Sequence, residues 1–398
     1  MTPIHVAFVM EQTLGHVTHF RNLQAVAAEQ EQLIPTWLPI SFETRGVERF
    51  IPVVRSNWSV RASWRARRAL DAALAARPHH AVVFHTQVTS LFSAGLMRRI
   101  PSIISLDATP INYDSVGHYY GHRPGRGSLL DRQKHRLNRE AFQAAAALVG
   151  WSEWVRRSLI DDYGIEAARI KVLAPGAAPA YFTIGERRHG VAARSAPPAP
   201  SAEPPEGERP VRLLFVGGDF RRKGGPLLLE CMRHGLAGRC ELHLVTQEPV
   251  PPQEHVYVHH GLRPNSEELL HLFAQADVFV LPSRADCLAV ALMEAAAAGL
   301  PVITTDVGAL SEAVWPGQSG LLVRAGDTRA LYQAIATLVE DEPLRWRMGR
   351  ESLALARAKF DARTNNRALL ELAAQIASEL PAHDQGTGIA AGRQRRVA

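Results

Sequence analysis

The sequence predicts an α/β protein of two doubly wound, Rossmann-like domains that face each other across a central cleft. Three observations carry this prediction: short apolar runs alternate with helical patterns, the alternation stops at a proline-rich stretch, and it starts again after that stretch. A chain of 398 residues with 46% hydrophobic and 21% charged residues is long enough for two such domains and has the composition of a globular protein.

The first predicted domain covers residues 1–190. Its apolar runs have the length of buried parallel strands, and helical patterns over 60–76 and 129–146 fill two of the gaps between them. The predicted strands are 4–10, 34–40, 81–85, 102–106 and 147–151.

A linker and a second domain follow. Prolines over 194–210 disfavour both helix and central strand, so we expect an extended linker there and a second domain over 211–360. A helix over 288–298 should end at Gly299, a residue suited to a left-handed cap. A last helix is expected within 361–382, and the polar segment 383–398 is expected to be disordered. The predicted strands are 211–216, 241–246, 256–259, 278–281, 301–304 and 320–323.

The charge balance argues against a nucleic-acid partner. The chain has 45 Lys and Arg against 39 Asp and Glu, a net charge of +6, which favours anionic ligands without supplying a basic tract. Three cysteines without metal-ligand spacing indicate a reducing compartment, so we expect a cytoplasmic protein. Because no run of about eighteen apolar residues is present, we expect no membrane-spanning helix.

A predicted helix near residue 60 combines aromatic and basic side chains. Such a helix can attach to a membrane surface, which would place the protein at the periphery of the inner membrane face. The alternative is a solvated helix whose tryptophans pack inward. The residues concerned are Trp58, Arg61, Trp64, Arg65, Arg67 and Arg68.

The loop after the first strand of the second domain has the features of a phosphate site. Gly217 and Gly218 let backbone N–H groups approach an anion, and a helix begins near residue 226. Lys223, with Arg221 or Arg222, supplies full positive charge, so a diphosphate would fit here. For either arginine alone, a solvated turn is an equally good interpretation.

A second loop of this domain places two carboxylates near one cleft. Asp286 precedes the predicted helix and is expected near its N-cap, and Glu294 lies about two turns further on. Carboxylates bind vicinal hydroxyls well, while the amides of Cys287, Leu288 and Ala289 can reach phosphate oxygens. The alternative makes Asp286 a simple cap and Glu294 an exposed helical acid.

Two loops of the first domain face the same cleft. Gly15 opens a helix whose start helps to bind anions, and His16 and His19 follow it as candidate site residues or as surface or capping histidines. Asp107 ends another strand in the cleft, where it is a candidate site residue or forms a turn before Pro110. The stretch 112–126, rich in Tyr, His and Gly, is a candidate functional loop.

These motifs resemble the family 4 glycosyltransferases of the GT-B fold. That family is marked by a glutamate, seven residues and a second glutamate, followed by small residues and Gly-x-Pro-Val, and several such motifs at the right separations make the match specific. The matching residues are Asp286, Glu294, Gly299, Pro301 and Val302, the segments 305–312 and 317–323, and the stretch that ends at Gly224.

The resemblance implies a retaining transfer of a sugar from a nucleotide sugar to a hydroxyl acceptor, which is a glycan, a lipid-linked molecule or a small molecule. By this analogy Glu294 holds the ribose, Asp286 the sugar hydroxyls and Lys223 the diphosphate, while Asp107 orients the acceptor. The first domain then binds the acceptor and the second the donor, and the last helix crosses back to the first domain. No metal and no further cofactor are implied, and no Asp-x-Asp follows a predicted strand.

The chain departs from the family pattern at the donor loop. Asp286 replaces the commoner glutamate, and Gly218 stands where many relatives carry an arginine, so that Arg221 or Arg222 would take over. Cys287 and Ala289 replace typical glycines. Two other functions therefore stay open: a nucleotide-sugar 2-epimerase of the same architecture, and a catalytically silent sugar-nucleotide-binding protein.

Overall fold

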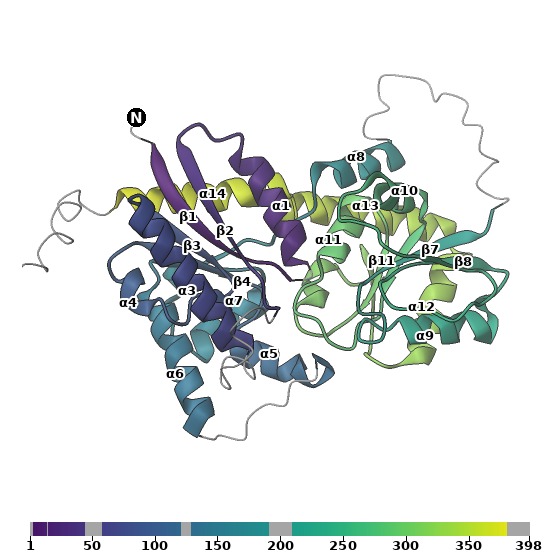
Figure 1. Cartoon of the computed structure of the whole chain (residues 1–398). Helices are drawn as coiled ribbons and strands as arrows, with labels where there is room; N and C mark the ends of the chain where they lie inside the picture. The colour runs from purple at the N-terminus through teal and green to yellow at the C-terminus, as the bar shows by residue number, and fades with distance from the viewer. Residues whose placement is uncertain (1–2, 14, 44–57, 121–128, 191–208, 380–398) are drawn as a thin grey trace, which may run out of the picture.

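The chain forms two parallel six-stranded sheets flanked by helices (Figure 1). The computed structural model describes residues 3–13, 15–43, 58–120, 129–190 and 209–379. The strand orders are β2-β1-β3-β4-β5-β6 in the first sheet and β12-β11-β10-β7-β8-β9 in the second. The first strand of each half lies inside its sheet, which is the doubly wound arrangement, so the predicted fold class is confirmed.

Strands of the first sheet form where the sequence has unbroken apolar runs. Every residue of β3 and β4 is buried, as expected for strands that helices cover on both faces. The expected strands are all present, but β6 was not expected, because its three residues include an exposed lysine and are too few to show a pattern. The strands are β1 (Ile4–Glu11), β2 (Leu33–Ile40), β3 (Ala81–His85), β4 (Ser102–Leu106), β5 (Ala147–Gly150) and β6 (Ile170–Val172).

The second sheet follows the same principle, and its strands agree with the expected ones to within about one residue at each end. Its central strand, β10, is buried throughout. The strands are β7 (Val211–Val216), β8 (Cys240–Val245), β9 (Val256–His259), β10 (Val278–Leu281), β11 (Val302–Thr305) and β12 (Gly320–Val323).

Helices of the first half cover both faces of its sheet (Figure 1). The helix expected from residue 60 begins two residues earlier, and the one expected to end at 146 ends at Ala144. The helices are α1 (His16–Ala27), α3 (Trp58–Ala76), α4 (Ala94–Met97), α5 (Pro110–Val116), α6 (Leu129–Ala144) and α7 (Glu153–Asp161).

The remaining helices surround the second sheet, with the exception of α14. In Figure 1, α14 runs from the second domain back across the first sheet, where Leu369, Leu370 and Ala373 pack in one core with Val6 and Phe8 of β1. The helices are α8 (Pro179–Arg188), α9 (Gly225–Cys231), α10 (Glu267–Gln275), α11 (Val290–Ala297), α12 (Thr328–Glu340), α13 (Glu342–Lys359) and α14 (Ala362–Ser378).

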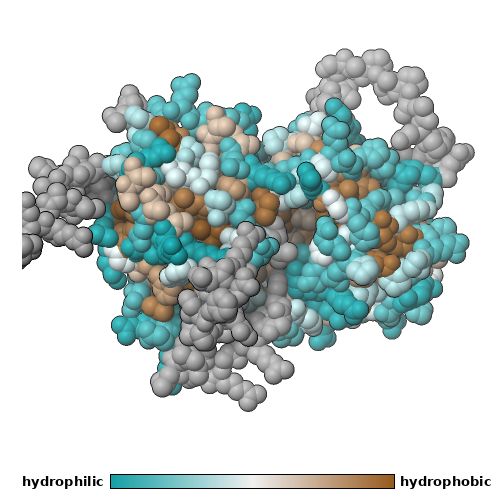
Figure 2. Space-filling view, viewed as in Figure 1, coloured by the Kyte–Doolittle hydropathy of each residue, from teal (hydrophilic) through white to brown (hydrophobic). Residues whose placement is uncertain are grey.

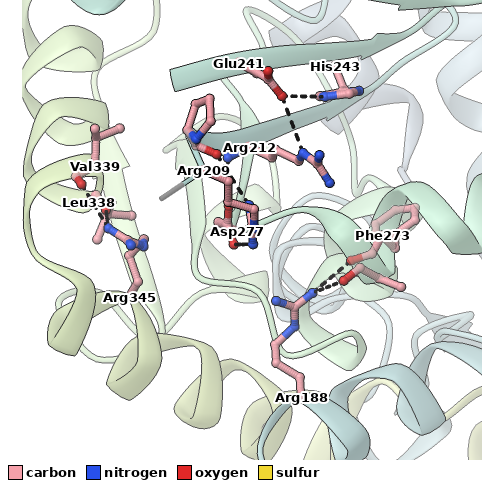
Figure 3. A network of polar contacts seen from close by, with 12 residues as sticks. Arg188, Arg209, Arg212, Glu241, His243, Phe273, Asp277, Leu338, Val339 and Arg345 are labelled. Atoms are coloured by element: carbon pink, nitrogen blue, oxygen red, sulfur yellow. Dashed lines mark hydrogen bonds and ion pairs between the residues drawn. The ribbon is translucent and has the colours of Figure 1, made fainter. Parts of the chain in front are cut away.

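Helix α8 packs with the second sheet although it precedes the predicted linker. Tyr181 is fully buried against Phe273 of α10, with ring centroids 5.0 Å apart. The Arg188 guanidinium donates to the carbonyl oxygens of Phe273 and Ala274, both at 3.0 Å (Figure 3), and to that of Ala298 at 3.1 Å. Arg188 thus satisfies the ends of α10 and α11, where carbonyls lack helical partners. Most of the predicted linker, 194–210, and the predicted tail, 383–398, lie outside the described residues.

A polar network fixes the edge of the second domain (Figure 3). Asp277, just before β10, accepts hydrogen bonds from two nitrogens of Arg209, both at 2.7 Å, and from the backbone N–H of Arg212 at 2.7 Å. The paired geometry is the strong form of an Arg–carboxylate contact, so it joins the start of β7 to β10. The guanidinium of Arg209 and the backbone N–H of Arg212 therefore stabilise the fold through Asp277 rather than bind a ligand.

Contacts between the domains fix how their sheets face each other. The Glu312 carboxylate of the second domain accepts the backbone N–H groups of Glu153 and Trp154, each at 2.8 Å, in the first turn of α7. Asn265 donates to the side-chain oxygen of Asn22 at 3.2 Å. An anion at a helix N-terminus is favourable, so Glu312 holds the two domains together at one end of the cleft.

The viewed surface is mostly hydrophilic on both domains, with separate apolar spots (Figure 2). Among the described residues, none of the helices has the length and apolar character needed to cross a bilayer.

Candidate active site

A cavity of about 680 Å³ lies between the domains, and residues at the carboxyl ends of strands in both sheets line it. This is where an open α/β sheet binds its ligands. The structure brings almost all the residues singled out from the sequence to this one cavity. Those that line it are Gly15, Asp107, Gly217, Gly218, Arg222, Lys223, Asp286, Cys287, Leu288, Ala289 and Glu294.

His16 lines the cavity as well, whereas Arg221, which is exposed, and His19, which is buried in the first domain, do not. Arg222 is buried and holds the loop together: its Nη1 donates to the Ala285 carbonyl at 2.6 Å and its Nε to the Asp219 carboxylate at 2.8 Å. Of the two arginines expected to take over from the family's arginine, only Arg222 lines the cavity, because the turn directs the Arg221 side chain into solvent. Arg222 adds positive charge from within the loop.

Lys223 reaches the cavity because two glycines make room for its loop. A Cβ on Gly217 would lie 2.5 Å from Cδ of Lys223, so a larger residue would displace the lysine stem. Gly224 has φ +84°, and a Cβ there would lie 2.1 Å from the Pro282 carbonyl oxygen. Any other residue at position 224 would therefore change the start of α9, which follows it.

Lys223 and Asp286 form an ion pair in the cavity, with Nζ and Oδ2 2.5 Å apart. Nη1 of Arg222 lies 3.6 Å from the same oxygen. The alternative that makes Asp286 a simple cap of α11 is wrong, because Ala289 occupies the N-cap position and α11 begins at Val290. The two cations hold the Asp286 carboxylate in the cavity, so it is available to a ligand rather than to helix amides.

Glu294 lies in the second turn of α11 and is only 5% exposed. Burial raises the pKa of its carboxyl group to about 7, and the nearby Tyr181 hydroxyl offsets part of that rise. The alternative of an exposed helical acid is therefore wrong. A buried carboxylate with a shifted pKa that lines a cavity is a typical functional group.

The opposite wall, from the first domain, carries two more carboxylates. Glu11 ends β1 and accepts a hydrogen bond from the Thr86 hydroxyl at 2.6 Å, and Asp107 follows β4. Nε2 of His16 lies 3.6 Å from the Asp107 carboxylate and 3.9 Å from that of Glu11. The sequence did not single out Glu11 or Thr86, although their position at strand ends was a sufficient signal.

Behind His16 lies a packed group of rings. Nδ1 of His16 is 2.9 Å from Nε2 of His85, and the ring centroids of His19 and His85 are 5.3 and 5.4 Å from that of Trp151. Burial lowers the pKa of His19 to about 3 and that of His85 well below its usual value, so both are neutral. His19 is thus a core residue, neither a surface nor a capping histidine, and the group orients His16.

Asp107 does not cap the following helix. Thr109 takes that role, because its hydroxyl accepts the N–H of Asn112 and the Asn112 side chain accepts the N–H of Thr109. Asp107 instead lies close enough to Cys287 of the second domain to raise the pKa of that buried thiol further, after the larger effect of burial. The two domains therefore meet across the cavity at this point.

The part of the chain that the structure describes provides no evident set of metal ligands. No group of three or more His, Cys, Asp or Glu side chains there has an arrangement that could hold a metal ion. The histidines near His16 pack against each other and Trp151 rather than around a common point.

Two family models match the chain, one on each domain. Residues 20–176 match "Glycosyl transferase 4-like domain", and residues 210–341 match "Glycosyl transferases group 1". Together they cover the second-domain wall of the cavity and part of the first-domain wall, since Glu11, Gly15 and His16 precede residue 20.

Relatives and solved structures agree with these models. A D-inositol 3-phosphate glycosyltransferase of Pseudarthrobacter chlorophenolicus is 30% identical over 253 residues, which are 58% of this chain and 55% of that protein. The chain spans about half the length of the curated relatives it matches.

Among solved structures, sucrose-phosphate synthase of Thermosynechococcus elongatus matches with a TM-score of 0.70 at 16% identity, over 94% of this chain and 99% of that one. Anabaena Alr3699/HepE in complex with UDP-glucose matches with a TM-score of 0.63 at 15% identity, over 94% and 100%. These likenesses show the same fold. The two family models, with the D-inositol 3-phosphate glycosyltransferase relatives, show that the chain belongs to the family 4 glycosyltransferases, whose GT-B fold the solved structures share.

Proposed function

We propose that this protein transfers a sugar from a nucleoside diphosphate sugar to a hydroxyl group, with retention of configuration and without a metal ion. The observation that carries the proposal is one cavity with Lys223, Asp286 and Glu294 on one wall and His16 and Asp107 on the other. Cations, hydroxyl-binding carboxylates and a second polar wall are what a diphosphate, a sugar and an acceptor require together.

The donor would bind the second domain. Glu294 accepts hydrogen bonds from the ribose hydroxyls, and the first-turn amides of α11 with Lys223 contact the diphosphate. Asp286 receives the hydroxyls of the donor sugar. Lys223 and Asp286 form an ion pair in the ligand-free protein. When the donor binds, Lys223 must contact the phosphate and Asp286 the sugar, and the ion pair is either kept or broken.

The reaction would proceed on one face of the sugar. As the bond to the diphosphate breaks, negative charge grows on the leaving oxygen, where Lys223 and the charge of Arg222 stabilise it. That oxygen takes the proton of the incoming hydroxyl, which Asp107 orients with help from His16. The protein supplies no nucleophile and no metal in this scheme.

Thermal unfolding in a panel of nucleotide sugars tests donor binding. The panel begins with UDP-glucose and UDP, which the Anabaena neighbour binds in its solved complexes. The true donor should raise Tm, because it binds the folded state alone, and the shift should persist in EDTA. If no nucleotide sugar raises Tm, the proposed donor chemistry is wrong, and a shift that EDTA removes would disprove metal independence.

Product analysis with that donor separates the remaining alternatives. A transferase releases nucleoside diphosphate faster when acceptor is present. Inositol 3-phosphate is a rational first acceptor to test, because the relatives are named D-inositol 3-phosphate glycosyltransferases. NMR of the product should show the donor's anomeric configuration. Isomerised nucleotide sugar without acceptor would indicate an epimerase, and binding without turnover a silent protein.

Replacing Asp107 tests the acceptor wall. Asp107→Asn should lower the transfer rate about 10- to 100-fold, since a misdirected hydroxyl loses its alignment, while the donor-induced Tm shift stays unchanged. Asp161→Asn, at an exposed residue at the end of α7, is the matched control and should have no effect. A normal transfer rate in Asp107→Asn would remove Asp107 from the mechanism.

The cytoplasmic location and contact of α3 with a membrane stay predictions. Of its aromatic and basic side chains, Trp58 is 42% exposed, whereas Arg61 is buried and Arg68 lies over the Trp64 ring, 4.7 Å from its centroid.

A further inference from the structure

Part of the cavity on the first domain is apolar. We call it the apolar wall: Phe42, Trp58, Val88 and Leu91 all line the cavity. Val88 and Leu91 are buried, whereas Trp58 remains 42% exposed. The Trp58 indole is therefore a partly exposed apolar surface at the edge of the cavity.

The apolar wall is a built feature rather than a chance exposure. The buried Arg61 of α3 donates to the Phe42 carbonyl oxygen through Nε at 3.2 Å and Nη2 at 2.8 Å. This contact holds Phe42 against α3, with its ring centroid 5.3 Å from that of Trp58. The N–H of Phe92, next to Leu91, donates to the Ser63 hydroxyl of α3 at 3.1 Å.

The apolar wall continues directly from the polar groups that face the reacting sugar. Thr86 donates to Glu11 at 2.6 Å, and Val88 follows two residues later. The Thr89 hydroxyl donates to the Thr86 carbonyl at 3.0 Å, which fixes this turn. A molecule whose hydroxyl lies at His16 and Asp107 therefore extends along Val88 and Leu91 toward Phe42 and Trp58.

We infer that the acceptor carries an apolar body, an alkyl chain or an aromatic group, that packs on the apolar wall while its hydroxyl lies at Asp107 and His16. This inference rests on the proposed transfer reaction and adds the chemical class of the acceptor. A small polyol phosphate would leave the apolar wall in contact with water. Its phosphate would find little support from Lys134, which lines this side of the cavity but is exposed on α6. Removing apolar surface from water supplies the affinity instead.

Calorimetric titration with glucosides of increasing apolar size tests the inference. The probes are methyl, hexyl and phenyl β-glucoside, used below any micelle concentration and with the donor's nucleoside diphosphate present. Each buried methylene strengthens binding about fourfold, and hexyl glucoside has five more methylenes than methyl glucoside, so burying only two of them should make it bind at least about tenfold more tightly. The phenyl arm distinguishes an aromatic body from an alkyl chain, and tighter binding of either supports the inference.

Variants locate the binding. Trp58→Ala should weaken hexyl glucoside binding about fivefold or more, whereas Trp346→Ala, at a similarly exposed tryptophan (40%) on α13, should leave it unchanged. Val88→Thr keeps the side-chain shape but replaces a methyl group with a hydroxyl, so it should also weaken hexyl glucoside binding. It provides the test if Trp58→Ala fails to fold. In every variant the donor-induced Tm shift should equal that of the wild type.

The outcomes separate this inference from the proposed function. Equal binding of all three glucosides, or equal loss in Trp58→Ala and Trp346→Ala, would overturn the apolar-acceptor inference while the donor results stand. Tighter binding of glycerol 3-phosphate than of hexyl glucoside would overturn it in favour of a small anionic acceptor. Absence of any donor-induced Tm shift would instead contradict the proposed function itself.

Discussion

Lys223→Ala should lower kcat/KM for sugar transfer by about two to three orders of magnitude. The reason is the loss of a full positive charge beside the departing diphosphate, in a cavity where water does not replace it well. Initial rates at several donor and acceptor concentrations give the value. The donor-induced Tm shift should also shrink or vanish, because the same contact exists in the bound ground state.

The neighbouring Arg221 provides the matched control. It is one of three consecutive cations, but it is exposed and outside the cavity, so Arg221→Ala should change kcat/KM by less than about twofold. If both variants lose the same activity, the effect is a general loss of positive charge rather than a contact of Lys223 with the diphosphate.

A double-mutant cycle with Asp286 separates two causes of the Lys223 effect. Removing Lys223 leaves the Asp286 carboxylate, 2.5 Å from Nζ, without its nearest cation. If the loss came from that unpaired carboxylate alone, Lys223→Ala would cost nothing in an Asp286→Ala background. Direct phosphate contact requires that most of the loss persist there.

Glu294→Gln should stabilise the ligand-free protein at pH 8 by about 3 kcal/mol while weakening donor binding. The stability effect follows from the pKa of Glu294, which burial raises from 4.5 to about 7. Denaturant titrations of the wild type and the variant from pH 4 to pH 8 measure the free energy of unfolding.

The direction of the pH effect follows from the proton count. Below pH 4.5 Glu294 is protonated in both states and contributes no penalty. Between pH 4.5 and about 7 the unfolded chain has released this proton while the folded protein keeps it, so stability falls as pH rises. Above about pH 7 the buried carboxylate is ionised and the full penalty remains, which the glutamine variant avoids.

Donor binding should show the opposite preference. If the ionised Glu294 accepts the ribose hydroxyls, donor affinity falls about tenfold per pH unit below about pH 7, because binding must then remove a proton. In Glu294→Gln this pH dependence should disappear, with affinity about 10- to 150-fold weaker at pH 8, the value of a hydrogen bond to a charged group.

Two controls make the Glu294 result specific. Glu31→Gln replaces an exposed glutamate outside the cavity and should leave both stability and donor affinity unchanged. Tyr181→Phe keeps the carboxyl group but removes the hydroxyl that lowers its pKa. The fall in stability should therefore continue to a higher pH than in the wild type. A wild-type protein whose stability difference from Glu294→Gln does not vary between pH 4 and pH 8 would contradict the buried carboxylate.

The sequence alone was sufficient for the fold and for the second-domain residues that line the cavity. Buried parallel strands are continuous apolar runs, so eleven of the twelve strands in the described residues were recognisable, and β6 was missed because it is three residues long. The spacing from Asp286 to Glu294 and the glycines before Lys223 also identified two second-domain loops that line the cavity, because both motifs are local in the chain and follow strands that end at one sheet edge.

Only the tertiary structure decided how these groups pair and which are buried. The contact between Lys223 and Asp286 joins residues 63 positions apart, and Arg221 and Arg222 differ solely in which side of a turn they occupy. The raised pKa of Glu294 comes from its burial in the folded protein, and the position of Asp107 opposite Cys287 comes from the docking of two domains. The hydropathy pattern of a segment reflects which of its residues are buried and which are exposed, whereas distances between segments depend on the packing of the whole chain.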